Sequence, residues 1–168
     1  MIRKKGKLKI WSAACSNGAE PYSVAMILDQ LTPRQIHTID ATDIDDKILQ
    51  DARKGCYKAD LLKNVSPDRL AKYFTKDGDT FCLSQDIKNK VKFKKHDLIK
   101  DSYQTNYDLI ICRNVTIYFT KEIQNQLYEN FRKSLAPDGI LFIGATESVL
   151  DHKELGFNKV SPWFYQKN

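Results

Sequence analysis

The sequence predicts an α/β domain built around a mainly parallel β-sheet. Apolar, strand-like segments alternate with amphipathic helical segments, the pattern of a sheet whose strands are joined by helices. Polar sequences follow three of these strands directly, as expected where a parallel sheet binds a ligand. The chain has 168 residues, enough for one hydrophobic core. We therefore expect one domain over residues 1–168, with a small inserted β-subdomain over residues 79–96.

Two strand–helix units are predicted in the first third of the chain. Glu20 opens the first helix, where a carboxylate complements the positive end of the helix dipole. Gly55 follows the second helix and is a typical residue for ending one. The expected elements are a strand over 8–13, a helix over 20–31, a strand over 36–42 and a helix over 46–54.

The middle of the chain interrupts this rhythm. Ser66, followed by proline and aspartate, predicts the start of a short helix reaching residue 74. Lysines alternate with Val91 and Phe93, which is the period of a strand with one solvated face. After a turn over 76–79, we expect residues 80–83 and 90–95 to form an antiparallel pair.

The last third returns to the strand–helix pattern. Apolar side chains from Ile123 to Leu135 recur every four residues, which predicts an amphipathic helix. The expected elements are a strand over 107–112, a helix over 120–135, a strand over 140–143 and a terminal hairpin over 157–160 and 163–166.

The charge balance is basic, with a formal net charge of +6. A basic surface suits an acidic partner, and nucleic acid is one candidate. The alternation in residues 88–95 favours a solvated edge strand over a nucleic-acid patch, because lysines also protect sheet edges. We therefore expect no nucleic-acid partner.

No apolar run approaches the roughly 18–20 residues of a membrane span, and the basic N-terminus lacks a signal-peptide core. We expect a cytoplasmic protein without direct membrane insertion. Because nothing suggests a large apolar interface, a monomer is expected.

The cysteines and histidines do not predict a metal site. The three histidines are scattered, and no two cysteines form a CxxC pair. Neither a zinc site nor a disulfide scaffold is expected, and Cys112 is expected to be a small buried side chain. The four cysteines are Cys15, Cys56, Cys82 and Cys112.

The first candidate ligand-binding sequence is the polar turn over residues 12–18. Its small residues allow a ligand to approach the backbone, and amides at a helix start can bind it. An ordinary tight turn between strand and helix is the alternative. The chain has neither a GxGxxG fingerprint nor a GxxxxGK[ST] phosphate loop, which disfavours nicotinamide and nucleoside triphosphate chemistry.

The second candidate is Asp43, which ends the second predicted strand. An acidic side chain about 20 residues after such a loop commonly binds ribose hydroxyls. The alternative is helix capping, which Asp43 or Asp45 could perform.

The third candidate is Arg113, which directly follows the apolar strand over residues 107–112. An arginine at the end of a buried strand needs a partner, and its guanidinium suits a substrate carboxylate. A structural salt bridge is the alternative, and charge alone does not decide between them.

These segments resemble the CheR-type chemotaxis receptor methyltransferases, which are protein-glutamate O-methyltransferases. Residues 11–23 (WSAACSNGAEPYS) are similar to the family's cofactor loop, usually WSAGCSTGEEPYS, and residues 41–45 match its ATDID segment. Residues 112–119 are close to CRNVMIYF. Residues 137–142 and 147–148 are similar to its PDGLLF and SE segments. The resemblance thus covers nearly the whole chain.

The resemblance implies a Rossmann-like class I S-adenosylmethionine methyltransferase sheet. A C-terminal hairpin would add an antiparallel strand, and a small inserted antiparallel β-subdomain would dock a receptor tail in some members. The implied activity, part of chemotaxis signal transduction, forms methyl esters on glutamates in the cytoplasmic domain of methyl-accepting chemotaxis receptors. The cofactor would be S-adenosylmethionine and its product S-adenosylhomocysteine. The alternative is a non-catalytic cofactor-binding or protein-docking module of the same fold.

The resemblance also implies roles for individual residues. Glu20 and the loop would contact the methionine part of the cofactor, Asp43 the ribose, and Asp97 with Leu98 the adenine. Arg113 and Tyr118 would be catalytic and orient the substrate carboxylate. The implied cofactor-binding residues are Ala13, Ser16, Asn17, Gly18, Glu20, Asp43, Asp97, Leu98, Arg113 and Asn114.

The chain departs from the family pattern in two respects. Ala14, Asn17, Ala19 and Asp97 replace a frequent glycine, threonine, glutamate and asparagine, respectively. Of these, Asp97 matters most, because it adds a charge beside the expected adenine site. The family also usually has an N-terminal helical domain, whereas this sequence begins almost at the first predicted strand.

Overall fold

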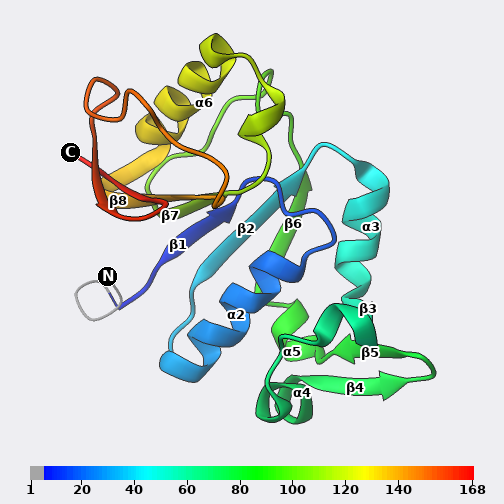
Figure 1. The fold of residues 1–168 in the computed structure, drawn as a ribbon. Coiled ribbons are helices and arrows are strands. Elements are labelled where there is room, and N and C mark those ends of the chain that lie inside the picture. Colours follow the sequence, from blue (N-terminus) through cyan, green and yellow to red (C-terminus); the bar gives the residue numbers. More distant parts are fainter. Residues whose placement is uncertain (1–5) are drawn as a thin grey trace.

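A computed structural model describes residues 6–168, in which a seven-stranded sheet is the central layer (Figure 1). Its strand order is β6-β2-β1-β7-β8-β10-β9. The first five run parallel, whereas β10 is antiparallel to both β8 and β9. The strands are β1 (Lys9–Ser12), β2 (Thr38–Asp43), β6 (Val91–Lys95), β7 (Tyr107–Cys112), β8 (Leu135–Ile143), β9 (Phe157–Ser161) and β10 (Phe164–Lys167). The predicted α/β sheet and terminal hairpin are thus confirmed.

Helices cover both faces of this sheet. Ile10 packs in one core cluster with side chains of α2, and its neighbour Trp11 packs in another with side chains of α6. Because successive strand residues point to opposite faces, α2 and α6 cover opposite sides of β1. The α-helices are α2 (Ala19–Leu31), α3 (Asp46–Lys54), α4 (Pro67–Tyr73), α5 (Gln85–Lys88) and α6 (Lys121–Ser134); η1 (Ala59–Leu62) and η2 (Thr116–Tyr118) are 3₁₀ turns.

The helix boundaries follow the local signals in the sequence. Gly55 ends α3 in the left-handed conformation with φ of 59°. Ser66 caps α4 by accepting a bond from the backbone N–H of Arg69. Both positions agree with the predictions.

The predicted pairing of residues 80–83 with 90–95 is wrong. The small antiparallel sheet has the order β3-β5-β4, whereas β6 pairs in parallel with β2 at the edge of the large sheet. Val91 is buried and Phe93 packs against the core cluster of α2, so burial of these side chains places β6 in the large sheet. The inserted sheet therefore lies within residues 56–83 rather than 79–96. Its strands are β3 (Cys56–Lys58), β4 (Phe74–Asp77) and β5 (Thr80–Leu83).

The sequence indicates no disulfide scaffold, but one disulfide is present: Cys56 and Cys82 are bonded across β3 and β5. They are 26 residues apart in sequence and become neighbours only through strand pairing. Cys15 and Cys112 are free and buried, as expected for Cys112.

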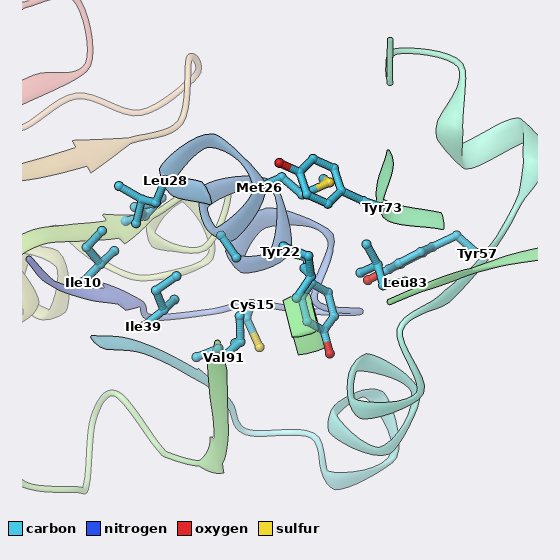
Figure 2. Close-up of a cluster of buried hydrophobic side chains, with 14 of the residues drawn as sticks. Ile10, Cys15, Tyr22, Met26, Leu28, Ile39, Tyr57, Tyr73, Leu83 and Val91 are labelled. Atoms are coloured by element: carbon cyan, nitrogen blue, oxygen red, sulfur yellow. The ribbon is translucent and has the colours of Figure 1, made fainter. Parts of the chain in front are cut away.

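The small sheet shares a core with α2 (Figure 2). Tyr57 of β3 and Leu83 of β5, together with Tyr73 at the end of α4, belong to the same buried cluster as Tyr22 and Met26 of α2. The small sheet is therefore anchored to the helix that follows β1. Within residues 6–168, no helix combines the length and apolar character needed to cross a membrane.

Candidate functional site

The carboxyl ends of β1, β2, β6 and β7 surround a mainly apolar cavity of about 280 Å³. This is where an open parallel sheet is expected to bind its ligand. Of the implied cofactor-binding residues, it brings together Ala13, Asp43, Asp97 and Leu98. Ala14 also lines the cavity, together with five residues that sequence reasoning missed: Ile44, His96, Ile99, Val115 and Phe119. Ile44, His96, Ile99 and Val115 lie within four residues of the end of a predicted strand, whereas Phe119 directly precedes the helix predicted over 120–135.

Asp43 holds the loop after β1 against the end of β2. Its Oδ2 accepts a 2.9 Å bond from the backbone N–H of Ser16, and its Oδ1 accepts one from the N–H of Asp45. Asp45, not Asp43, caps α3 by accepting bonds from Lys47 and Ile48. The capping alternative thus applies to Asp45. A carboxylate has about four acceptor positions, so Asp43 retains capacity for a ligand.

The loop after β1 is shaped by packing as well as by ligand access. Gly18 has φ of 82°, and a Cβ there would meet Ala52, Phe93 and Tyr22 at 3.0–3.2 Å. This glycine therefore allows α2 to begin in close contact with protein side chains rather than opening the cavity. The Oδ1 atom of Asn17 accepts a bond from the N–H of Ala19. Ser16, Asn17 and Gly18 are not among the residues lining the cavity.

Glu20 and Arg113 form an ion pair between α2 and the end of β7. Nη1 of Arg113 lies 3.6 Å from Oε2 of Glu20, whose other oxygen accepts a 2.7 Å bond from the Ser12 hydroxyl. Burial raises the pKa of Glu20, while Ser12 and Arg113 oppose that shift. The Arg113 side chain is 40% exposed, so a ligand can still reach the guanidinium that the structural ion pair uses.

The segment after β7 wraps around a buried carboxylate. Asn114 has φ of 60°, and its backbone N–H donates to Glu147, which lies on the connection after β8. No role was assigned to Glu147 from the sequence. Tyr118 is 80% exposed and is not among the residues lining the cavity, nor are Arg113 and Asn114.

Asp97 lies at the cavity but is already engaged by the local backbone. Its Oδ1 accepts bonds from the N–H groups of Ile99 and Lys100, and the bond from Ile99 is the main cause of its lowered pKa. Leu98 packs against the core cluster of α6. Asp97 thus shapes the turn that presents Leu98.

His96 lies between the cavity and the core. It is 8% exposed, its ring lies edge-on to Trp11, and burial lowers its pKa. Its Nε2 has no hydrogen-bond partner among residues 6–168. No cluster of three or more potential metal ligands occurs anywhere in residues 6–168.

Comparisons with known proteins give matches over most of the chain. The protein-family model described as CheR methyltransferase, SAM binding domain, matches residues 1–164 of this chain. A chemotaxis protein methyltransferase from Listeria monocytogenes is 39% identical over 163 residues, covering 97% of this chain and 62% of that protein. One from Escherichia coli K12 is 38% identical over 163 residues, covering 92% of this chain and 57% of that protein. The chain therefore spans about three fifths of the length of these curated relatives.

A solved structure supports the same fold. A TehB-like SAM-dependent methyltransferase from Corynebacterium glutamicum matches with a TM-score of 0.55 and 16% sequence identity. The match covers 95% of this chain and 77% of that one. At this identity the likeness concerns the fold alone, and it confirms the predicted class I methyltransferase sheet.

Proposed function

Since the chain belongs to the CheR methyltransferase family, we propose that it transfers a methyl group from S-adenosylmethionine to receptor glutamates. The substrate is the cytoplasmic domain of methyl-accepting chemotaxis receptors, and the products are a glutamate methyl ester and S-adenosylhomocysteine. The observation that carries the proposal is the position of Asp43. Its carboxylate accepts a hydrogen bond from the loop after β1 and lies at the rim of an apolar cavity.

The residues around the cavity fit this cofactor. Apolar side chains such as Ile44 and Leu98 suit an adenine ring, and the free acceptor positions of Asp43 suit the ribose hydroxyls. Glu20 carries a negative charge that complements the ammonium group of methionine, and its ion-pair partner Arg113 carries a positive charge that suits the substrate carboxylate. These five side chains come from four segments that meet at the carboxyl ends of the strands.

The chemistry needs little acid–base assistance from the protein. The cofactor supplies an electrophilic methyl group on a sulfonium, and a glutamate with a pKa of about 4.3 is already ionised at neutral pH. The protein's contribution is to align the carboxylate with the methyl group and to exclude water. Arg113 and Tyr118 are proposed to orient this carboxylate; exposure of Tyr118 leaves it accessible to an incoming receptor segment.

Calorimetric titration with S-adenosylmethionine and S-adenosylhomocysteine tests the cofactor site. Asp43→Ala should abolish saturable binding, whereas Asp46→Ala removes a nearby exposed carboxylate that pairs with Lys95 and should bind normally. Equal binding by wild type and Asp43→Ala would exclude the assigned ribose site. Absence of binding by a folded wild type would contradict the proposed cofactor.

Transfer is tested separately, with radiolabelled cofactor and receptor cytoplasmic fragments. The expected result is base-labile methyl incorporation that is lost when the receptor glutamates are replaced by alanine. Cofactor binding without any transfer would favour the non-catalytic alternative. Incorporation that survived the glutamate replacements would contradict the assigned acceptor.

A further inference from the structure

Glu147 accepts five hydrogen bonds, four of them from the segment after β7. Its Oε1 accepts from the backbone N–H groups of Val115 and Thr116 at 3.0 and 2.8 Å and from the Thr116 hydroxyl at 2.6 Å. Its Oε2 accepts from the N–H groups of Asn114 and Gly144 at 2.8 and 2.7 Å. Three consecutive amides therefore converge on one side chain that lies about 30 residues further along the chain.

This carboxylate is buried, and the described residues supply no cation to compensate it. Glu147 is 6% exposed, and among residues 6–168 no lysine or arginine nitrogen lies within 4.0 Å of it. Backbone amides and the Thr116 hydroxyl stabilise its charge, and these bonds outweigh burial and lower its pKa. The ionised form accepts bonds with both oxygens, as five converging donors require.

The surrounding atoms leave little freedom for another arrangement. A Cβ at Gly144 would lie 2.6 Å from Oε2 of Glu147 and 2.7 Å from Oδ1 of Asn114. Tyr128 of α6 lies 3.1 Å from the Thr116 hydroxyl, and because that hydroxyl donates to Glu147, Tyr128 is the donor. The carboxylate is thus connected to α6 as well as to the ends of β7 and β8.

We propose that Glu147 is a positioning residue that fixes the backbone of residues 113–116 for methyl transfer. It holds Asn114 in the left-handed conformation and thereby sets where the preceding Arg113 meets Glu20. Val115, bound through its N–H, contributes its side chain to the cavity wall. The inference rests on the proposed function, because Glu147 acts on cofactor and substrate only through this segment.

Substitution by glutamine separates the charge from the shape. In Glu147→Gln one oxygen becomes an NH₂ group, which cannot accept the bonds that converge on that side. Glu147→Asp keeps the charge but is shorter by one methylene, so it should retain part of the function. Thr116→Val removes one donor and leaves the carboxylate in place. The matched control is Glu154→Gln, because Glu154 is an exposed glutamate on the same connection between β8 and β9.

Three measurements on the complete chain test the proposal: amide hydrogen exchange, affinity for S-adenosylhomocysteine, and kcat and KM with receptor fragments. In folded Glu147→Gln, exchange at residues 114–116 should accelerate while residues 109–111 of β7 stay protected. The dissociation constant should rise at least ten-fold, and kcat should fall. Glu147→Asp should lie between wild type and Glu147→Gln, Thr116→Val should show a smaller effect, and Glu154→Gln should match wild type.

Unchanged exchange at 114–116, with affinity within two-fold of wild type, would overturn the proposal. If Glu147→Gln failed to fold, Thr116→Val and Glu147→Asp would decide: positioning predicts weakened binding by protein that remains folded. Lower stability with normal affinity in those variants would show a structural role alone and would also overturn it. Failure of wild type to bind would instead contradict the proposed function, and the exchange data would still show whether Glu147 holds the segment.

Discussion

The hydroxyl of Tyr57 in β3 donates a 3.0 Å hydrogen bond to the backbone carbonyl of Asn17, in the loop between β1 and α2. Tyr57 is otherwise buried in the core cluster that the small sheet shares with α2. This bond joins the inserted sheet to the loop that Asp43 holds from its other side.

Tyr57→Phe should loosen that loop without emptying the core. We expect a loss of about 1 kcal/mol in the free energy of unfolding, because one partly buried hydrogen bond is removed and the ring is kept. Affinity for S-adenosylhomocysteine should fall several-fold. Urea denaturation and calorimetry measure the two effects. Tyr73→Phe is the matched control, since its hydroxyl donates to Asp29 instead; an equal loss of affinity there would refute the link through Asn17.

Reduction of the Cys56–Cys82 bond should destabilise the protein. A cross-link that closes a loop of this size contributes about 2–4 kcal/mol, mainly by restricting the unfolded chain. Urea midpoints with and without a thiol reductant should therefore differ. The double variant Cys56→Ser/Cys82→Ser should unfold like the reduced wild type and should not respond to reductant. A reductant effect of equal size in that variant would assign the loss elsewhere.

Arg113→Ala and Tyr118→Phe should reduce turnover more than cofactor affinity. Both residues are proposed to orient the substrate carboxylate, and loss of such an interaction lowers kcat by about ten-fold or more. Because neither side chain is buried, the melting temperature should change little. Single-turnover transfer and calorimetry separate the two effects. Normal turnover in both variants would remove these residues from the catalytic assignment.

Glu20→Gln should stabilise the folded chain slightly at neutral pH, and it should lower the affinity for the cofactor. Burial raises the folded-state pKa of Glu20, so its charged form is disfavoured relative to the unfolded chain. This cost is fully present above the folded pKa, decreases as the pH falls below that value, and is absent below the unfolded pKa. Because the partly exposed ion pair with Arg113 offsets some of the cost, only a small gain is expected.

The pH dependence of binding checks the same assignment. Ionised Glu20 is proposed to contact the methionine ammonium, so wild-type affinity should fall with acid at a higher pH than an ordinary carboxylate would produce. The Glu20→Gln variant should lack that transition. Melting curves and calorimetry, from neutral pH down through the range in which an ordinary carboxylate protonates, provide both readouts. An identical acid transition in the variant would place the titrating group elsewhere.

Local signals in the sequence predicted the elements that depend on local chemistry. Gly55 ends α3 because a residue without a side chain enters the left-handed region easily, and Ser66 caps α4 through its own hydroxyl. The alternation of Val91 and Phe93 correctly indicated a strand, but the pattern does not specify which strand lies beside it.

The candidate site shows the same division between local and long-range information. Asp43 is predicted as a site residue because it ends a strand at a typical distance from the first loop, and the structure places it at the cavity. Glu147 was assigned no role because its partners are backbone amides about 30 residues earlier, and backbone amides carry no residue-specific signal. The disulfide between Cys56 and Cys82 is not predicted for a related reason, because only the pairing of β3 with β5 brings the two cysteines together.

The core shared by the small sheet and α2 has a thermodynamic consequence. Consider a ligand that binds the small sheet and favours the same position of Tyr57 as a ligand bound in the cavity. Binding at the small sheet and binding in the cavity are then coupled. The coupling must then be reciprocal: occupancy of the cavity strengthens binding at the small sheet by the same factor. A protein coupled in this way would bind its partner more tightly when the cofactor is bound and more weakly when it is absent.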